Sequence, residues 1–176
     1  MGLGAGAQHV TSATFEFLDH TGYGRLAHRM VSALSGVERY YCTDAVAVST
    51  FVSDYYLRFR GVDKAVVIPL DEIETALRGH PVDLAINIHS FSECRMQAIE
   101  WWIRLLSRHR VKNLMIVPAQ STSRGERLLT DHGQEFLPLL EQYGYRTVLK
   151  EPKYLDPVVQ EFGLQPTWHH LLEFRE

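Results

Sequence analysis

Residues 82–93, Val-Asp-Leu-Ala-Ile-Asn-Ile-His-Ser-Phe-Ser-Glu, constrain the fold more than any other part of the sequence. They begin as a nearly continuous apolar run, which is typical of a strand buried on both faces of a parallel sheet. They end in polar side chains, namely those of Asn87, His89, Ser90, Ser92 and Glu93. In open α/β sheets, ligands bind outside the carboxyl ends of the strands. The stretch therefore predicts either one side of a ligand site or a core strand whose polar end caps the next helix.

Strand and helix signals alternate along the rest of the chain. Besides the stretch above, we predict strands at 14–18, 38–42, 64–70 and 112–117, and helices at 25–34, 48–59, 72–78, 96–108 and 135–142. Two last strands, 145–150 and 169–174, follow with a loop between them instead of a helix. This order predicts an α/β fold with a Rossmann-like sheet of the methyltransferase type, mostly parallel with an antiparallel last strand, and with helices on both faces.

The helix at 48–59 is expected to bury one apolar face. Its apolar residues at helical spacing are Val48, Phe51, Val52, Tyr55 and Tyr56. The helix at 96–108 has the stronger pattern, with Ile99, Trp102, Ile103 and Leu106 on one side. We expect Trp101 and Trp102 to pack in the core or at an interface, and not to form a flat surface on which a sugar stacks.

Composition narrows the class of protein. The chain has 176 residues, enough for one domain, which we place at 14–176 after a flexible leader at 1–13. A net charge of -3 without a Lys/Arg stripe predicts no nucleic-acid partner, and the lack of an apolar run of about 18 residues predicts no membrane span. Two cysteines, Cys42 and Cys94, argue for reduced thiols and a cytoplasmic setting. The nine histidines show no ligand spacing, so no metal site is predicted.

Several motifs together resemble a known family. They are Ile-Asn-Ile-His-Ser-Phe-Ser-Glu at 86–93, Leu-Met-Ile-Val-Pro at 114–118, Glu-Pro-Lys-Tyr at 151–154, Asp-Pro-Val-Val at 156–159 and Gly-Tyr-Gly-Arg-Leu-Ala at 22–27. They resemble the sugar O-methyltransferases, which depend on S-adenosylmethionine and have the class I methyltransferase fold. The resemblance covers the chain from about residue 15 onward. It implies methyl transfer to a sugar or a glycosylated small molecule in glycan or natural-product biosynthesis.

The expected cofactor turn follows the first strand. Gly22, Tyr23 and Gly24 stand at the start of a helix, where glycine lets the backbone approach a ligand closely. The family pattern is an acidic residue followed by Gly-x-Gly-x-Gly. Here His20 stands in place of the first glycine and Leu18 in place of the acid. The turn is therefore either part of a cofactor site or a plain turn.

Three further residues are candidates for binding S-adenosylmethionine. Asp44 lies twenty residues beyond Gly24, where an acid can accept hydrogen bonds from a ribose diol, or can cap the following helix. Asp71 is placed either to meet the adenine edge or to cap the helix at 72–78. Asn87 ends the fourth strand, where its side chain can face the methionine portion.

His89 and Glu93 are the candidate catalytic residues. A sugar hydroxyl needs a base that removes its proton, and imidazole titrates near neutral pH. Glu93 would orient the imidazole or bind a sugar hydroxyl. The alternatives are a buried histidine bonded to the backbone and a first-turn acid favoured by the helix dipole. His169 and His170, beside Trp168, are expected to be strand packing.

Two functions remain open at this point. The first is the O-methyltransferase. The second is a methyltransferase-like domain without methyl transfer, which serves as a binding or assembly subunit or has been repurposed for another reaction; the altered glycine turn and the short N-terminal segment motivate it. The short segment also predicts that the acceptor side is covered by another chain, either a partner protein or a second copy that contacts the helix carrying Trp101 and Trp102.

Overall fold

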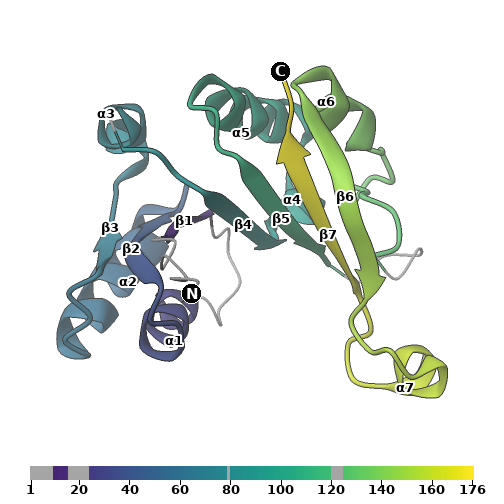
Figure 1. Ribbon diagram of the computed structural model, residues 1–176, viewed down its shortest axis with the longest axis horizontal. Helices are drawn as coiled ribbons and strands as arrows, with labels where there is room; N and C mark the ends of the chain where they lie inside the picture. Colours follow the sequence, from purple (N-terminus) through teal and green to yellow (C-terminus); the bar gives the residue numbers. More distant parts are fainter. Residues whose placement is uncertain (1–9, 16–23, 79, 120–124) are drawn as a thin grey trace, which may run out of the picture.

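The structure is a computed structural model, and it describes residues 10–15, 24–78, 80–119 and 125–176 (Figure 1). Within these ranges, seven strands form one sheet in the order β3-β2-β1-β4-β5-β7-β6. The strands are β1 (Val10–Phe15), β2 (Val37–Thr43), β3 (Ala65–Val67), β4 (Leu84–His89), β5 (Asn113–Pro118), β6 (Tyr145–Pro152) and β7 (Trp168–Phe174).

The direction of each strand agrees with the sequence pattern. All neighbouring pairs from β3 to β5 are parallel, whereas β7 is antiparallel to both β5 and β6. Because β7 runs against its neighbours, the end of β6 and the start of β7 lie at the edge where β4 and β5 end. The strand order reverses between β1 and β4, which is where open α/β sheets bind their ligands.

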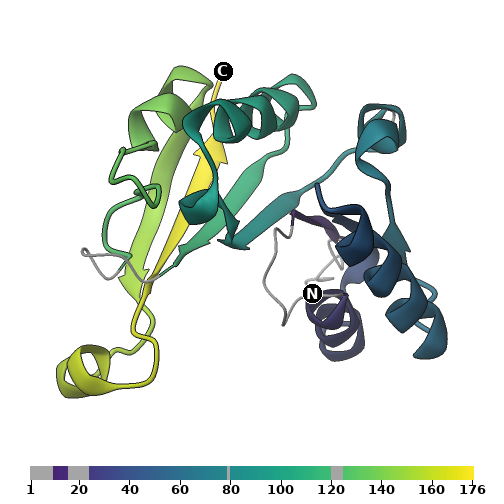
Figure 2. The ribbon, with the colours of Figure 1, turned by 180° about the vertical axis from the view of Figure 1, so that it is seen from behind.

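Helices cover both faces of the sheet. Successive side chains of a strand point to opposite faces, and β2 shows this directly. Tyr40 and Cys42 pack in a cluster with Ala27 and Leu57, which come from α1 (Arg25–Ala33) and α2 (Ala47–Phe59). Tyr41 belongs to the larger cluster on the other face, with α3 (Ile73–Leu77), α5 (Met96–Arg108) and α6 (Leu137–Gln142). Figure 2 shows α5 and α6 in front of the strands they cover.

The helix α5 has the predicted bounds and buries the predicted face. Ile99, Trp102, Ile103 and Leu106 are each at most 2% exposed. Among the helices that the structure describes, none has both the length and the apolar character that a membrane span requires.

The predicted apolar face of α2 is wrong in part. Val52 and Tyr56 are partly buried, and Tyr56 packs against the cluster that contains Leu57, whereas Val48, Phe51 and Tyr55 are exposed. The buried residues of α2 are Ser49, Ser53 and Leu57, four residues apart, whereas Phe51 is 69% exposed and Tyr55 65%. Gly24, the residue before α1, lies close to the side chain of Leu57 and to the carbonyl of Ser53, so the face of α2 that carries these two residues is the one that packs against the start of α1. The outward face is an apolar stripe formed by Val48, Phe51, Tyr55 and Phe59, with the last two rings stacked at 6.5 Å between centroids.

Two short helices were not predicted. The helix α4 (Ser90–Glu93) continues directly from β4, and α7 (Pro157–Phe162) interrupts the predicted loop at 151–167. The sequence does contain a signal for α7, since Asp156 accepts hydrogen bonds from the N–H groups of Val158 (2.8 Å) and Val159 (3.1 Å), with Pro157 in the first turn.

Several boundaries also differ from the prediction; β3, for example, is shorter than the predicted strand at 64–70. The first strand spans 10–15 and not 14–18, so it includes residues 10–13 that we assigned to the leader. Asp71 does not cap a helix: it lies inside a short 3-10 helix, η1 (Leu70–Glu72), and neither η1 nor α3 has a side-chain cap.

Candidate functional site

The candidate site lies at the edge of the sheet where the parallel strands end. β1 is flanked by β2 and β4, so Asp44 after β2 and His89 at the end of β4 stand on either side of the end of β1. Of the predicted glycine turn, Gly24 is described, whereas Gly22 and Tyr23 lie outside the described residues.

Asp44 is buried at this edge, with 8% of its surface exposed. Its Oδ1 accepts a hydrogen bond of 2.8 Å from the N–H of Val46, one residue before α2. Burial raises the pKa of the Asp44 carboxyl, and hydrogen bonds from Val46 and Ser49 oppose that rise. Asp44 thus stabilises the turn into α2, and it also lines a hollow.

A cavity of about 600 Å³ lies between the end of β2, α2, η1 and α5. We call it the cofactor hollow because two of the residues that the sequence analysis assigned to the cofactor line it. Its lining residues are Asp44, Ala45, Ala47, Thr50, Pro69, Leu70, Asp71 and Trp101. Small-molecule sites are typically concave and mostly apolar, with a few polar groups that fix orientation. Two carboxylates in an otherwise largely apolar lining suit a nucleoside, which has a flat base and a diol. The structure therefore brings two predicted cofactor residues together, and Trp101, which was not predicted to contribute, joins them.

The two tryptophans of α5 have different roles. Trp102 is 2% exposed and belongs to the core, whereas Trp101 is 39% exposed and lines the cofactor hollow. Their rings meet edge to face, with 4.7 Å between centroids. Only Trp101 is accessible to a ligand or a partner.

Gly24 has a packing role that the sequence did not reveal. Its φ of +74° is a conformation that glycine adopts without strain. A Cβ at this position would lie 2.9 Å from Cγ of Leu57 and 3.2 Å from the carbonyl oxygen of Ser53. The close contact between α1 and α2 alone therefore requires glycine here.

Asn87 connects β4 to α4. It is 1% exposed, its Oδ1 accepts a hydrogen bond from the N–H of Phe91 (3.1 Å), and its Nδ2 donates to Oγ of Ser90 (3.2 Å). These are the contacts of a residue that caps a short helix. A contact between Asn87 and the methionine portion of a cofactor stays a prediction.

His89 has an unusual backbone conformation at the end of β4. Its φ is 66° and its ψ is -33°. A non-glycine residue in such a sparsely populated region costs of order 1–3 kcal/mol, and residues of this kind cluster at functional sites. Next to it, Oγ of Ser92 accepts a hydrogen bond of 3.0 Å from the N–H of Ala119, which fixes α4 to the end of β5. The side chain of His89 is partly buried.

The acceptor hollow, as we call the cavity beside His89, has a volume of about 370 Å³. Its lining residues are Ile88, His89, Val117, Lys153, Gln165, Thr167 and His169. The last four come from the end of β6 and the approach to β7, and the prediction assigned no function to any of them. Only the antiparallel placement of β7 brings them to the end of β4.

The two neighbouring histidines of β7 differ. The prediction that both are strand packing holds for His170, which is 4% exposed, has Nε2 2.9 Å from the carbonyl oxygen of Gly125, and has its pKa lowered mainly by burial. His169 points to the opposite face of the strand and lines the acceptor hollow.

Glu93 ends α4 and is exposed. It does not line the acceptor hollow. Its charge instead acts on Cys94, whose pKa is raised to about 11, first by burial and then by Glu93 and Asp131. The structure thus does not bring Glu93 into the same cavity as His89, and its catalytic role stays a prediction.

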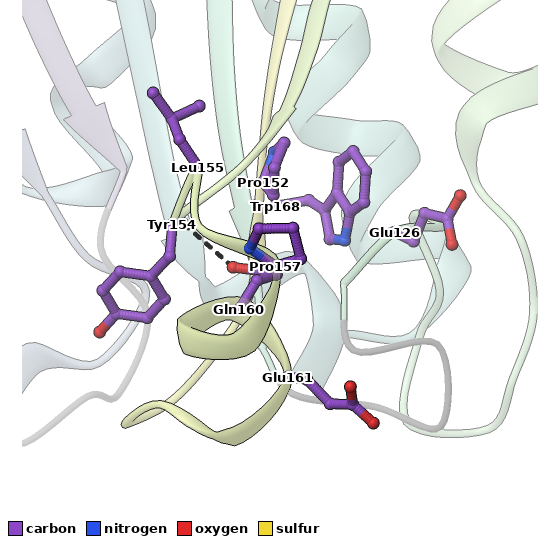
Figure 3. Close-up of a pocket in the computed structure, with 8 residues that line it drawn as sticks. All are labelled: Glu126, Pro152, Tyr154, Leu155, Pro157, Gln160, Glu161 and Trp168. Carbon is purple, nitrogen blue, oxygen red and sulfur yellow. Dashed lines mark hydrogen bonds between the residues drawn. The ribbon is translucent and has the colours of Figure 1, made fainter.

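A third cavity, of about 420 Å³, lies beside α7 (Figure 3). Its lining includes Trp168, the first residue of β7, and the carboxylates Glu126 and Glu161. Among the described residues, no group of three or more His, Cys, Asp or Glu side chains is placed to hold a metal ion.

Solved structures with a similar fold include several methyltransferases. The mitomycin 7-O-methyltransferase MmcR has 16% identity to this chain and a TM-score of 0.66. The match covers 96% of this chain and 50% of the MmcR chain. The M. capricolum TrmK, solved with S-adenosylhomocysteine, has 13% identity and a TM-score of 0.56, covering 97% of this chain and 66% of its own. The methyltransferase domain of bacterial CtHen1 has 12% identity and a TM-score of 0.66, covering 93% of this chain and 90% of its own.

These comparisons concern the fold. The chain spans about half the length of MmcR and about two thirds of TrmK. No protein-family model and no curated protein matches the sequence. Together with the strand order and the antiparallel β7, the likenesses show that the chain has a Rossmann-like fold of the methyltransferase type.

Proposed function

We propose that this chain is an S-adenosylmethionine-dependent O-methyltransferase that acts on a sugar or a glycosylated small molecule. One observation carries the proposal: the cofactor hollow with Asp44 and the acceptor hollow with His89 lie on either side of β1, at the point where the strand order reverses. The motif at 86–93 supports the sugar class, and the fold of the neighbouring structures supports methyl transfer.

The cofactor would lie along the edge of the sheet. The Asp44 carboxylate accepts hydrogen bonds from the ribose diol, and Asp71, at the other end of the hollow, accepts one from the adenine amino group. Gly22, Tyr23 and Gly24 are proposed to contact the cofactor, although only Gly24 is among the described residues, and Asn87 is proposed to face its methionine portion. When bound, S-adenosylmethionine supplies a methyl group on an electrophilic sulfonium.

The chain's own residues position the acceptor and remove its proton. The acceptor hydroxyl would lie in the acceptor hollow, where a neutral imidazole nitrogen of His89 would accept the hydroxyl proton and so make the oxygen a nucleophile. The strained backbone of His89, fixed on both sides by β4 and α4, holds the ring at the end of the strand. Glu93 is exposed at the end of α4 and does not line the acceptor hollow, so its proposed role is to bind a hydroxyl of a part of the acceptor that extends out of the hollow.

Calorimetry with S-adenosylmethionine tests the cofactor part. We expect Asp44→Ala to weaken binding by about 10-fold or more, because a hydrogen bond to a charged group contributes about 1.5–3 kcal/mol. The matched control is Asp63→Ala, an exposed acid that does not line the cofactor hollow. If the unaltered chain binds neither S-adenosylmethionine nor S-adenosylhomocysteine, the proposal is wrong.

A transfer assay tests the role of His89. We expect His89→Ala to lower kcat for methylation of a sugar acceptor by about 10²-fold or more, with unchanged affinity for S-adenosylmethionine, because the residue acts on the acceptor proton. His80→Ala, an exposed histidine between α3 and β4, serves as the control.

One observation favours the second candidate, a methyltransferase-like domain that serves as an assembly subunit. The apolar stripe of α2 exposes Val48, Phe51, Tyr55 and Phe59 on one helix face, and contiguous exposed apolar surface marks interaction sites. This candidate predicts a partner protein that co-purifies with the chain, the loss of that partner in Phe51→Ser, and no methyl transfer. Robust methylation by the isolated chain would exclude it.

A further inference from the structure

We infer that the acceptor hollow takes an acceptor with an anionic group, a carboxylate or a phosphate, close to the hydroxyl that is methylated. The inference rests on the proposed function and names the substrate class for the same site. It comes from the ionisable side chains that line the three larger cavities described above, which are the cofactor hollow, the acceptor hollow and the cavity beside α7.

These three cavities differ in the ionisable side chains that line them. The cofactor hollow is lined by the carboxylates Asp44 and Asp71, and the cavity beside α7 by Glu126 and Glu161, in both cases with no lysine, arginine or histidine. The acceptor hollow is lined by His89, Lys153 and His169, with no aspartate or glutamate. The basic side chains are thus concentrated in the one cavity where the acceptor would bind.

Lys153 brings a positive charge that no carboxylate offsets within the described part of the chain. Its Nζ donates to the carbonyl oxygens of Leu164 and Gln165, at 3.3 Å each, and lies 5.0 Å from the centre of the Tyr154 ring. These neutral partners hold the ammonium group in place without neutralising it. Lys150, three residues earlier, is instead paired with Glu126 at 3.5 Å.

The backbone around Lys153 is fixed before any ligand binds. Its N–H donates to the carbonyl of Thr167 (2.8 Å), and Oγ1 of Thr167 donates to the carbonyl of Pro118 at the end of β5 (2.8 Å). Gln160 of α7 donates to the same Thr167 carbonyl at 3.0 Å. A site that is ordered in advance loses less entropy when it binds a ligand, which favours a specific acceptor.

His169 supplies a second donor, opposite His89. Its cross-strand neighbour on β6 is Glu151, a partly buried residue that does not line the hollow. An imidazole donates a hydrogen bond in its neutral form as well as in its charged form. Hydrogen bonds from an ammonium or imidazole group to a carboxylate or phosphate are roughly twice as strong as those between neutral groups. Ile88 and Val117 complete the lining with apolar side chains, next to which these bonds are less screened by water.

The test is calorimetry with three probes: methyl glucuronide, glucose 1-phosphate and methyl glucoside. We expect one or both acidic probes to bind at least about 10-fold more tightly than the neutral one, and whichever binds identifies carboxylate or phosphate as the anion. Lys153→Gln and His169→Gln should each remove about 10-fold of that preference. The matched control is Lys150→Gln, which removes a lysine that is paired with Glu126 outside the acceptor hollow.

Three results would overturn the inference. They are equal affinity for all three probes, no binding of either acidic probe at millimolar concentration, and a loss in Lys150→Gln as large as in Lys153→Gln. Circular dichroism and thermal unfolding establish that each variant is folded. Binding of S-adenosylmethionine, measured separately, distinguishes the failures: a chain that binds the cofactor but no acidic probe refutes this inference alone, whereas a chain that binds neither refutes the proposed function as well.

Discussion

Replacing Gly24 by alanine should destabilise the protein through the contact between α1 and α2. The new Cβ would lie 2.9 Å from Cγ of Leu57 and 3.2 Å from the carbonyl oxygen of Ser53, and the second of these atoms belongs to a helix backbone that cannot move by itself. Overpacking of this kind costs about 1–3 kcal/mol. The φ of +74° adds about 1–2 kcal/mol for a residue with a side chain. Alanine also restricts the unfolded chain and so recovers about 0.4–1 kcal/mol, which leaves an expected fall in the free energy of unfolding of about 2–4 kcal/mol.

Gly61→Ala is the matched control for this substitution. Gly61 also has a positive φ, +63°, but a Cβ there meets nothing within 4 Å. It should cost only the conformational part, about 1 kcal/mol, because alanine also restricts the unfolded chain and so recovers some of the strain. The difference between the two variants isolates the close approach of α1 and α2.

Urea denaturation, with both variants compared at equal m-values, gives the two free energies. Gly24→Ala in a Leu57→Ala background should cost less than in the unaltered chain, because the nearest contact has been removed, but more than Gly61→Ala, because the contact with the carbonyl oxygen of Ser53 remains. If Gly24→Ala and Gly61→Ala lower the stability equally, the close approach is not what requires glycine. Binding of S-adenosylmethionine below the melting temperature then shows whether Gly24 also contributes to the cofactor turn.

Three further predictions concern packing, a buried hydrogen bond and pH. Ser53→Leu should lower the free energy of unfolding by about 1–3 kcal/mol because Ser53 is on the buried face of α2. Phe51→Ser should change the free energy of unfolding by about 0.5 kcal/mol or less because Phe51 is 69% exposed. If urea denaturation shows that Phe51→Ser is the more destabilising of the two, the orientation of α2 is contradicted. Tyr145→Phe should cost about 1–3 kcal/mol, since the hydroxyl donates to the buried carbonyl of Val111 at 2.9 Å, and an unchanged denaturation midpoint would refute this. Burial lowers the pKa of His170, so the unfolded chain binds more protons than the folded one as the pH falls below about 6.5. The free energy of unfolding should therefore decrease from pH 7 to pH 5. His170→Gln should reduce this pH dependence, and an unaltered pH dependence in the variant would argue against a contribution from His170.

The sequence by itself determined the parallel part of the sheet and most of its elements. The helix α5 has the predicted bounds. Four strands begin and end within about two residues of their predicted positions, namely β2, β4, β5 and β7. The antiparallel last strand followed from the missing helix signal between the last two strands, although the loop there contains the short helix α7. These elements could be predicted because each has a strong local pattern of apolar residues, and such patterns report burial directly.

The tertiary structure alone decided which face of α2 is buried. Both faces of this helix carry residues that a core accepts, and the sequence favoured the larger apolar ones. The start of α1 at Gly24 approaches α2 on the side of Ser53 and Leu57, so this side is buried, whereas Phe51 and Tyr55 on the other side are exposed. Contacts between elements that are distant in sequence set this choice, and no local pattern contains them.

The same distinction holds for the site. Asp44 and His89 could be found from the sequence because each follows a predicted strand, and the ends of parallel strands share one edge of the sheet. Lys153 and His169 could not, because they reach that edge only through the reversal of β7 and its pairing with β5. The sequence thus determined where the site lies, whereas the charge that faces the acceptor depends on how the end of β6 and the start of β7 pack beside β4 and β5.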